Sequence, residues 1–221
     1  MNYLVALQQH LESARNDVEA ERMSAYMKGH FQFLGIKAPD RKRLLSSFLK
    51  QHGKPNREEL SDVIIGLWSL PYREYQYCAM EIAQKVIKKP LPDDMLTVTY
   101  MLEYKQWWDT IDFIASNLVG HIFEHDHEAK HTYFNKWIAS KDMWLNRTAI
   151  LFQLKYKEKT DSELLTKAIL PHVASKEFFH QKAIGWALRQ YSKFNRDWVS
   201  EFINQHELAP LSKREASKYL N

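Results

Sequence analysis

Five alanines recur along the chain at nearly constant spacing, and this spacing constrains the fold more than any other feature of the sequence. They are Ala79, Ala115, Ala149, Ala183 and Ala216, with successive separations of 36, 34, 34 and 33 residues. Each lies in a helical pattern, with a large apolar or aromatic residue three places later. A period in the mid-thirties, built from two helices, is typical of HEAT, armadillo or tetratricopeptide solenoids. The tetratricopeptide consensus is not present, and such spacing can also arise by chance in a helical protein.

Signals for β-strands are nearly absent, so the sequence predicts an all-α fold. The 221 residues include only six glycines and seven prolines, and we find neither a two-residue hairpin turn nor sustained alternation of apolar and polar residues. We expect helix over residues 2–28 and from Asp40 to about Lys50, with Gly35 as a helix C-cap and Pro39 preventing continuation. Further breaks are expected at Leu70–Pro71, at 89–92, near Gly120, around 140–142, at Leu170–Pro171 and at Ala209–Pro210.

No linker or low-complexity stretch divides the chain, so residues 1–221 are predicted to form one domain, a superhelical α-solenoid. A solenoid of this kind offers a concave face for an extended ligand. The net charge of +4 permits a polyanionic partner without requiring one. The single cysteine, Cys78, excludes an internal disulfide and fits a cytosolic setting, where it is expected to be a buried, inert thiol. No signal peptide or membrane-spanning stretch is recognisable.

The segment from Tyr104 to Asp112 holds two adjacent tryptophans and two aspartates, with no glycine or proline to break a helix. Trp108 and Asp112 are four residues apart, so a helix places them on one face, one turn from each other. This pair is the candidate core of an active site. The alternative is that the tryptophans belong to the apolar core and the aspartates to a solvated face.

A candidate basic partner for Asp112 follows one repeat later. Asp112 lies three places before its alanine and Arg147 two places before its own, so similarly placed helices project them within about 100° of each other. The two could instead form only a structural ion pair. The same register does not place Trp186 beside Asp112.

The basic residues are spread unevenly along the chain, and the stripes that some of them form in its second half can bind phosphates. The alternative for each is a solvated helix face. The candidates are Lys155, Lys182, Arg189, Lys193, Lys213 and Arg214.

Four histidines cluster at His121, His125, His127 and His131, and the first two are one helical turn apart. A zinc site uses such spacing, but no HExxH motif is present, and we expect no metal here. We also find no glycine-rich phosphate loop, nucleophile elbow or catalytic triad.

Seven segments of the chain recur together in one known family. They are Phe33–Ile36, Trp107–Asp112, Trp137–Ser140, Leu151–Lys157, Ser175–Phe179, Gln181–Trp186 and Leu208–Ala216. Through these segments the chain resembles AlkD-type bacterial DNA alkylation-repair glycosylases. The resemblance covers nearly the whole length, and the WWDxxD and GW segments are specific in combination.

This resemblance implies a stack of HEAT-like repeats that holds duplex DNA in a basic concave groove and excises cationic N3- and N7-alkylated purines without a cofactor. It implies that Asp112 is the catalytic carboxylate, that Trp108 and Trp186 flank the deoxyribose, and that Arg147 belongs to the same site. Tyr26 joins the basic residues above as an expected DNA contact. The lesion is expected to stay stacked, and the protein to act as a cytoplasmic, nucleoid-associated monomer.

Two other functions remain open at this stage. One is a non-catalytic solenoid that binds nucleic acid or a protein partner, which loss of the carboxylate would favour, although Asp112 is present. The other is a metal-dependent hydrolase that uses the histidine cluster.

Overall fold

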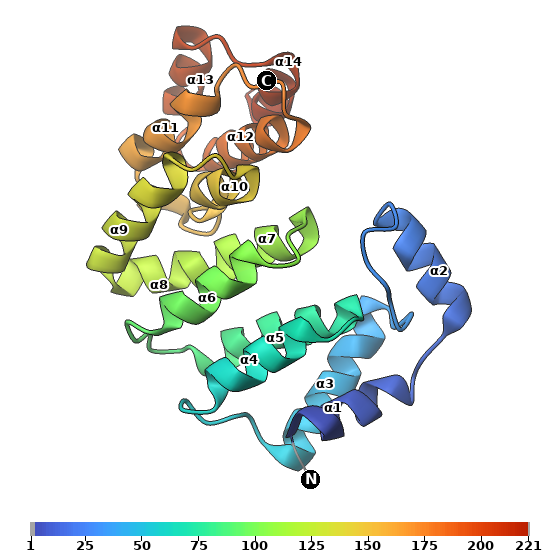
Figure 1. Ribbon diagram of the computed structural model, residues 1–221. Coiled ribbons are helices and arrows are strands. Elements are labelled where there is room, and N and C mark those ends of the chain that lie inside the picture. Colours follow the sequence, from blue (N-terminus) through green and yellow to red (C-terminus); the bar gives the residue numbers. More distant parts are fainter. Residues whose placement is uncertain (1–2, 221) are drawn as a thin grey trace. The chain divides into compact units, whose positions relative to one another are not determined.

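The computed structural model describes residues 3–220, and the regular elements in that range are helices, joined by one isolated β-bridge between Gln32 and Tyr72 (Figure 1). The all-α fold is therefore confirmed. The chain divides into two compact units, residues 1–88 and residues 89–221, and each unit is described by itself. The assignment of the whole chain to one domain stays a prediction.

Unit 1 contains a helical bundle and a loop that is fixed by one buried carboxylate. Glu74 is fully buried, and its Oε1 accepts hydrogen bonds from the backbone N–H of Gly35 and Ile36 at 3.0 and 3.1 Å, while Oε2 accepts from Leu34 at 2.9 Å. The carboxylate thus satisfies three backbone donors that no helix or strand would satisfy. The helices of unit 1 are α1 (Tyr3–Glu12), α2 (Asp17–Tyr26), α3 (Ala38–His52), α4 (Leu60–Ser69) and α5 (Arg73–Val86).

The prediction of one helix over residues 2–28 is wrong, because the chain turns between α1 and α2; residue 2 lies outside the described range. Asn16 adopts an extended conformation, and its side chain accepts the backbone N–H of Glu19 at 3.1 Å, which caps α2.

The prediction of Gly35 as a helix C-cap is also wrong. Gly35 has φ +85° in the loop held by Glu74, where an added Cβ would lie 2.0 Å from the carbonyl oxygen of Asn16. Pro39 lies in the first turn of α3.

Unit 2 is a row of packed helices that carries every candidate site residue except Tyr26. In it, α10 packs against α7 on one side and α12 on the other, and α12 packs against α14; α6, α9, α11 and α13 each pack on a member of this row. The α-helices are α6 (Asp94–Glu103), α7 (Trp108–Ile114), α8 (Gly120–His125), α9 (His127–Ile138), α10 (Met143–Leu151), α11 (Ser162–Ile169), α12 (Phe178–Tyr191), α13 (Arg196–Gln205) and α14 (Pro210–Ala216). A π-helix spans Ala115–Val119, and 3₁₀ turns span Lys157–Lys159, Leu170–His172 and Ser217–Tyr219.

The repeating alanines mark equivalent buried positions. In unit 2, Ala115, Ala149, Ala183 and Ala216 are at most 1% exposed, and each lies on the row α7–α10–α12–α14 or on the π-helix that continues α7. Ala79 has the same burial on α5 in unit 1. A methyl group at these positions lets neighbouring helices pack at the density of a protein interior. The mid-thirties period therefore reports real helical repeats.

Two helix boundaries in unit 2 differ from the sequence prediction. The helix does not break near Gly120, because α7, the π-helix and α8 follow one another directly and the chain turns only at Asp126. Conversely, the segment from Tyr104 to Asp112 is not one helix. Lys105 takes φ +52° and Trp107 is extended, so that α7 begins at Trp108. The interruptions that do occur, at Asp126 and at Lys105–Trp107, have no glycine or proline to signal them in the sequence.

Helices α12 and α14 approach each other closely at Gly185. A Cβ at this position would lie 2.5 Å from the Cβ of Glu215 and 3.0 Å from the carbonyl oxygen of Ser212. Ser212 is fully buried, and its hydroxyl donates to the carbonyl of Gln181 at 3.1 Å. The two helices are therefore held in one register by direct contact of their backbones.

We predict that Gly185→Ala lowers the free energy of unfolding by about 1–3 kcal/mol, because α12 and α14 must separate to admit the methyl group. Gly66→Ala, inside α4, is the matched control. Its new Cβ meets only the mobile end of Leu4, so the helix propensity of alanine should leave stability equal or higher. Denaturant unfolding of both variants tests this. Equal stability of Gly185→Ala and the wild-type chain would contradict the close contact.

Candidate functional site

The centre of the site is a two-point ion pair between α7 and α10. Arg147 Nε lies 2.7 Å from Asp112 Oδ1, and its Nη2 lies 2.9 Å from Oδ2. The side chain of Arg147 is 5% exposed and that of Asp112 16% exposed. The guanidinium is thus enclosed, whereas the Asp112 side chain keeps partial access to solvent. Fork-to-fork geometry of this kind fixes the orientation of a carboxylate far better than a single contact does.

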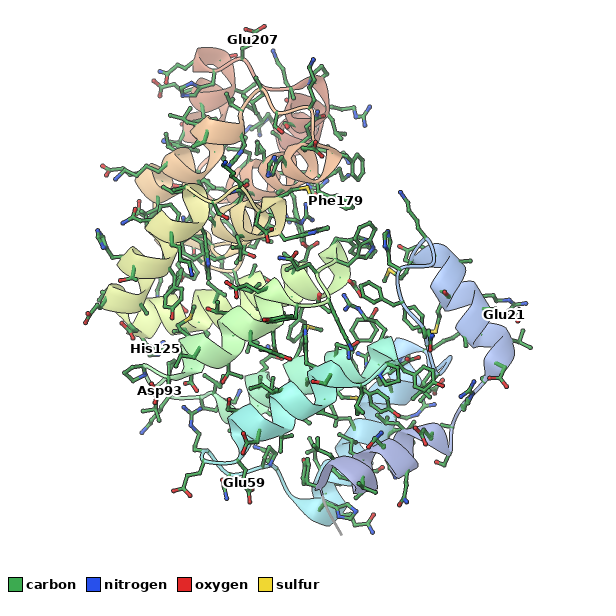
Figure 2. All side chains as sticks on the ribbon, in the orientation of Figure 1. Glu21, Glu59, Asp93, His125, Phe179 and Glu207 are labelled. Carbon is green, nitrogen blue, oxygen red and sulfur yellow. The ribbon has the colours of Figure 1, made fainter. Side chains whose placement is uncertain are left out.

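The third guanidinium nitrogen of Arg147 ties the pair to α12. Its Nη1 donates to the carbonyl of Phe179 at 2.6 Å, and the guanidinium carbon lies 5.8 Å from the Phe179 ring centroid. Phe179, which Figure 2 labels at the start of α12, packs against Trp144 and Trp107 with ring centroids 4.8 and 5.3 Å apart. Arg147 therefore bridges three successive helices of the row, next to a cluster of aromatic rings.

Local interactions fix the start of α10 and thereby the position of Arg147. Asp142 caps this helix by accepting the backbone N–H of Trp144 at 2.7 Å and of Leu145 at 3.3 Å. Gln106, in the turn before α7, also donates to Asp142 at 2.7 Å. Asn146 donates to the carbonyl of Trp137, in the last turn of α9, and to that of Ser140, just after the helix ends. The helix that carries Arg147 is therefore tied to the turn before α7 and to the helix that precedes it.

The electrostatic environment of Asp112 combines burial with a compensating charge. Burial raises the pKa of this carboxyl above its ordinary value, Arg147 works against that increase, and Asp109 adds to it. Two hydrogen bonds from Arg147 leave further lone pairs on both carboxylate oxygens. Asp112 can therefore accept a hydrogen bond from water, or face a developing positive charge, while it stays paired.

The two candidate tryptophans lie on helices that border the ion pair. Trp108 is the first residue of α7, one turn before Asp112, and is partly exposed. Trp186 is on α12, seven residues after Phe179, which places both on one face of that helix. The repeat position of Trp186 is occupied by buried Leu118 and Phe152 in the two preceding repeats, but Trp186 is only partly buried. Neither indole is enclosed in the apolar core.

The candidate DNA contacts near α10 and the end of the chain differ in their surroundings. Lys155 is exposed and donates to Asn117 on the π-helix. Lys193 donates to Gln190 at 3.0 Å and lies 5.1 Å from the Tyr219 ring centroid. Lys213 and Arg214 are exposed on α14, and Tyr26 is 72% exposed at the end of α2 in unit 1.

The structure brings Lys182 and Arg189 together around a carboxylate that sequence reasoning missed. Glu215 contacts both, at 3.3 and 2.6 Å. Sequence reasoning also missed Phe179, which acts through its backbone carbonyl, and Asn117, whose position depends on the π-helix. The repeat period could have predicted the contact of Lys182 with Glu215, since the two residues are 33 positions apart, which is one repeat.

The histidine cluster does not assemble as metal ligands. Among residues 3–220, no group of three or more His, Cys, Asp or Glu side chains is arranged to hold a metal ion. His125 bonds the carbonyl of His121 at 2.9 Å, and their rings stack edge to face. Cys78 is fully buried, which confirms the expectation of a buried thiol, and burial raises its pKa to about 12.

Comparison with known proteins gives the class that this fold and site define. The sequence model of the DNA alkylation repair enzyme family matches residues 7–220, so the chain belongs to that family. A solved structure described as a "predicted DNA alkylation repair enzyme" from Enterococcus faecalis is similar, with 39% identity, a TM-score of 0.85 and coverage of 93% of this chain and 96% of that one.

A second solved structure, smu.31 from Streptococcus mutans UA159, shares the fold at 13% identity. Its TM-score is 0.61, and the match covers 82% of this chain and 98% of that one. No curated protein matches the sequence. Within residues 3–220, none of the helices has the length and apolar character needed to cross a membrane.

We predict that Arg147→Lys lowers the free energy of unfolding by about 2 kcal/mol, because lysine cannot replace both contacts to Asp112 and the contact to Phe179. The pKa of Asp112 should rise further in this variant, since burial would be less well compensated. Denaturant unfolding and a carboxyl-carbon NMR titration measure the two effects. In the control Arg22→Lys, whose pair with Glu19 is exposed, stability should change by less than about 0.5 kcal/mol. Equal effects in the two variants would contradict a structural role for the fork.

Proposed function

We propose that this protein is an AlkD-type DNA glycosylase that hydrolyses the N-glycosidic bond of cationic N3- and N7-alkylated purines in duplex DNA. The observation that carries the proposal is the Asp112–Arg147 fork, one helical turn from Trp108, in a member of the DNA alkylation repair enzyme family. An alkylated purine already bears positive charge and is a good leaving group. The protein therefore needs to stabilise the sugar rather than protonate the base.

The proposed role of Asp112 follows from the charge that develops on the sugar. Cleavage of the glycosidic bond gives the deoxyribose oxocarbenium character, which a fixed carboxylate stabilises, and the same carboxylate orients or deprotonates the attacking water. The partly exposed side chain of Asp112 suits both tasks. Arg147 keeps the carboxylate ionised and aimed, so its effect on the reaction is exerted through Asp112.

The tryptophans would supply aromatic faces for cationic groups. Indole faces attract positive charge, and the partly exposed Trp108 and Trp186 lie on α7 and α12, the helices that border the ion pair. We propose that they flank the deoxyribose of the lesion. Recognition of charge on base and sugar needs no enclosing pocket, so the lesion can stay stacked in the duplex, unlike the flipped bases of most base-modifying enzymes.

The proposed partner is double-stranded DNA, bound by a monomer in the cytoplasm beside the nucleoid, without a metal or organic cofactor. Lys155, Lys193, Lys213 and Arg214 are proposed phosphate contacts, together with Lys182, Arg189 and Tyr26. Each phosphate contact releases a bound counterion, so affinity for duplex should fall steeply with salt.

We predict that Asp112→Asn lowers single-turnover excision of N7-methylguanine from duplex DNA by roughly 100-fold or more, because the stabilising negative charge is lost. Duplex affinity should persist, and wild-type excision should survive a strong chelator. Asp93→Asn is the control, since Asp93 is exposed at the start of α6 (Figure 2). Full excision by Asp112→Asn would refute the assignment of Asp112. Duplex binding without release of any alkylated base would indicate a non-catalytic solenoid.

The raised pKa of Asp112 predicts the acid side of the pH–rate profile. The carboxylate must be ionised to stabilise the sugar, so excision should decline as pH falls through a value above the ordinary aspartate pKa of about 4. Arg147→Lys should shift this decline to higher pH. Single-turnover rates between pH 4 and 8 measure it. A rate that stays constant across this range in both proteins would contradict a role for ionised Asp112.

A further inference from the structure

Three cations converge on one buried carboxylate between α12 and α14. Glu215 Oε2 lies 2.6 Å from Arg189 Nη1 and 2.9 Å from Lys218 Nζ, and Glu215 Oε1 lies 3.3 Å from Lys182 Nζ. The Glu215 side chain is 8% exposed, whereas the three cations are 25–48% exposed. The carboxylate thus lies beneath a surface formed by its partners.

The cluster keeps an excess of positive charge across the physiological pH range. The hydrogen bond from Lys218, together with Lys182, lowers the pKa of Glu215 to about 2. The carboxyl is therefore ionised at neutral pH, and it neutralises one of three positive charges. The remaining charge faces solvent and is available to an anionic ligand.

The backbone beneath this cluster is held rigidly. At Gly185 the two helices touch, with space for no Cβ, and the buried Ser212 binds the carbonyl of Gln181. Glu215 follows Ser212 by three residues on α14. The carboxylate is thus carried by closely packed backbone, and the side chains of Lys182 and Arg189 both contact it.

The cluster lies on the face of α12 that the candidate site uses. At about 100° per residue, Phe179, Trp186, Lys182 and Arg189 fall within about 80° of one another around the helix. Phe179 binds Arg147, and Trp186 is a proposed sugar contact. One face of α12 therefore presents, in order, the contact to the ion pair, a cation, an indole and a second cation.

We propose that Glu215 is a positioning residue that holds Lys182 and Arg189 as a preformed clamp for the phosphates beside the lesion, with Lys218 as a third member of the clamp. This inference rests on the proposed function, because it takes duplex DNA as the ligand. Ordering a long lysine or arginine side chain on binding costs conformational entropy. A carboxylate that orders these side chains beforehand reduces that cost.

A positioning role for Glu215 and simple electrostatics predict opposite changes in DNA affinity when its charge is removed. A negative charge close to a phosphate repels it, so removal of the charge alone should tighten DNA binding. If Glu215 instead orders the clamp, Glu215→Gln should weaken binding even though the protein becomes more positive. Glutamine keeps the size of the side chain but brings an amide donor toward the cations.

The experiment measures duplex affinity over a range of salt concentrations, together with single-turnover excision at saturating protein. We expect Glu215→Gln to raise the dissociation constant roughly tenfold and to reduce the salt slope by about one phosphate contact, with the saturated excision rate within about twofold of wild type. The matched control is Glu207→Gln, which changes charge by the same amount at an exposed position before α14 (Figure 2). It should bind as well as or better than wild type.

Equal or tighter duplex binding by Glu215→Gln, with an unchanged melting temperature, would overturn the clamp and leave the proposed function standing. A wild-type chain that binds no duplex would overturn both. If Glu215→Gln does not fold, Lys182→Gln and Arg189→Gln test the part of the clamp that binds phosphate, since both side chains are partly exposed. Each should weaken binding and reduce the salt slope, and unchanged binding in both would overturn the clamp.

Discussion

The bidentate pair between Asp112 and Arg147 is the interaction on which the site depends. A carboxylate that is largely buried costs free energy unless a partner compensates for its charge. Arg147 compensates through two hydrogen bonds and fixes the orientation of the carboxylate, and its third contact anchors the pair to the start of α12. The site therefore forms only when α7, α10 and α12 pack in their observed order. The arrangement of the candidate site thus depends directly on the packing of successive repeats.

The same arrangement recurs along the row of helices in unit 2. A polar side chain of one repeat is bound by a side chain of the next: Asp112 by Arg147 over 35 residues, and Lys182 by Glu215 over 33. In the first pair the side chain of the acid, Asp112, is the more exposed of the two. In the second pair the side chain of the cation, Lys182, is the more exposed. On this account the first pair presents negative charge to a cationic sugar, and the second presents positive charge to the phosphates around it.

The repeat period explains which parts of the structure could be predicted from the sequence. The near absence of strand signals predicted an all-α fold, and the repeat period predicted a solenoid and placed Asp112 and Arg147 on similarly oriented helices one repeat apart. It could not predict the break at Lys105, where a lysine adopts a left-handed conformation, or the π-helix at Ala115–Val119 that joins α7 directly to α8. Both depend on tertiary packing that local residue preferences do not record. The contact of Arg147 with Phe179 involves a backbone carbonyl, so the identity of residue 179 carries no signal for it.

In the reaction that we propose, ionised Asp112 faces a positively charged sugar. The most direct test is the affinity of the protein for two duplexes that carry a stable analogue of the abasic sugar, one with a cationic ring nitrogen and one with a neutral ring oxygen. A site complementary to the transition state should bind the cationic duplex at least roughly tenfold more tightly, and Asp112→Asn should abolish that preference. Equal affinity of the wild-type protein for the two duplexes would contradict the account.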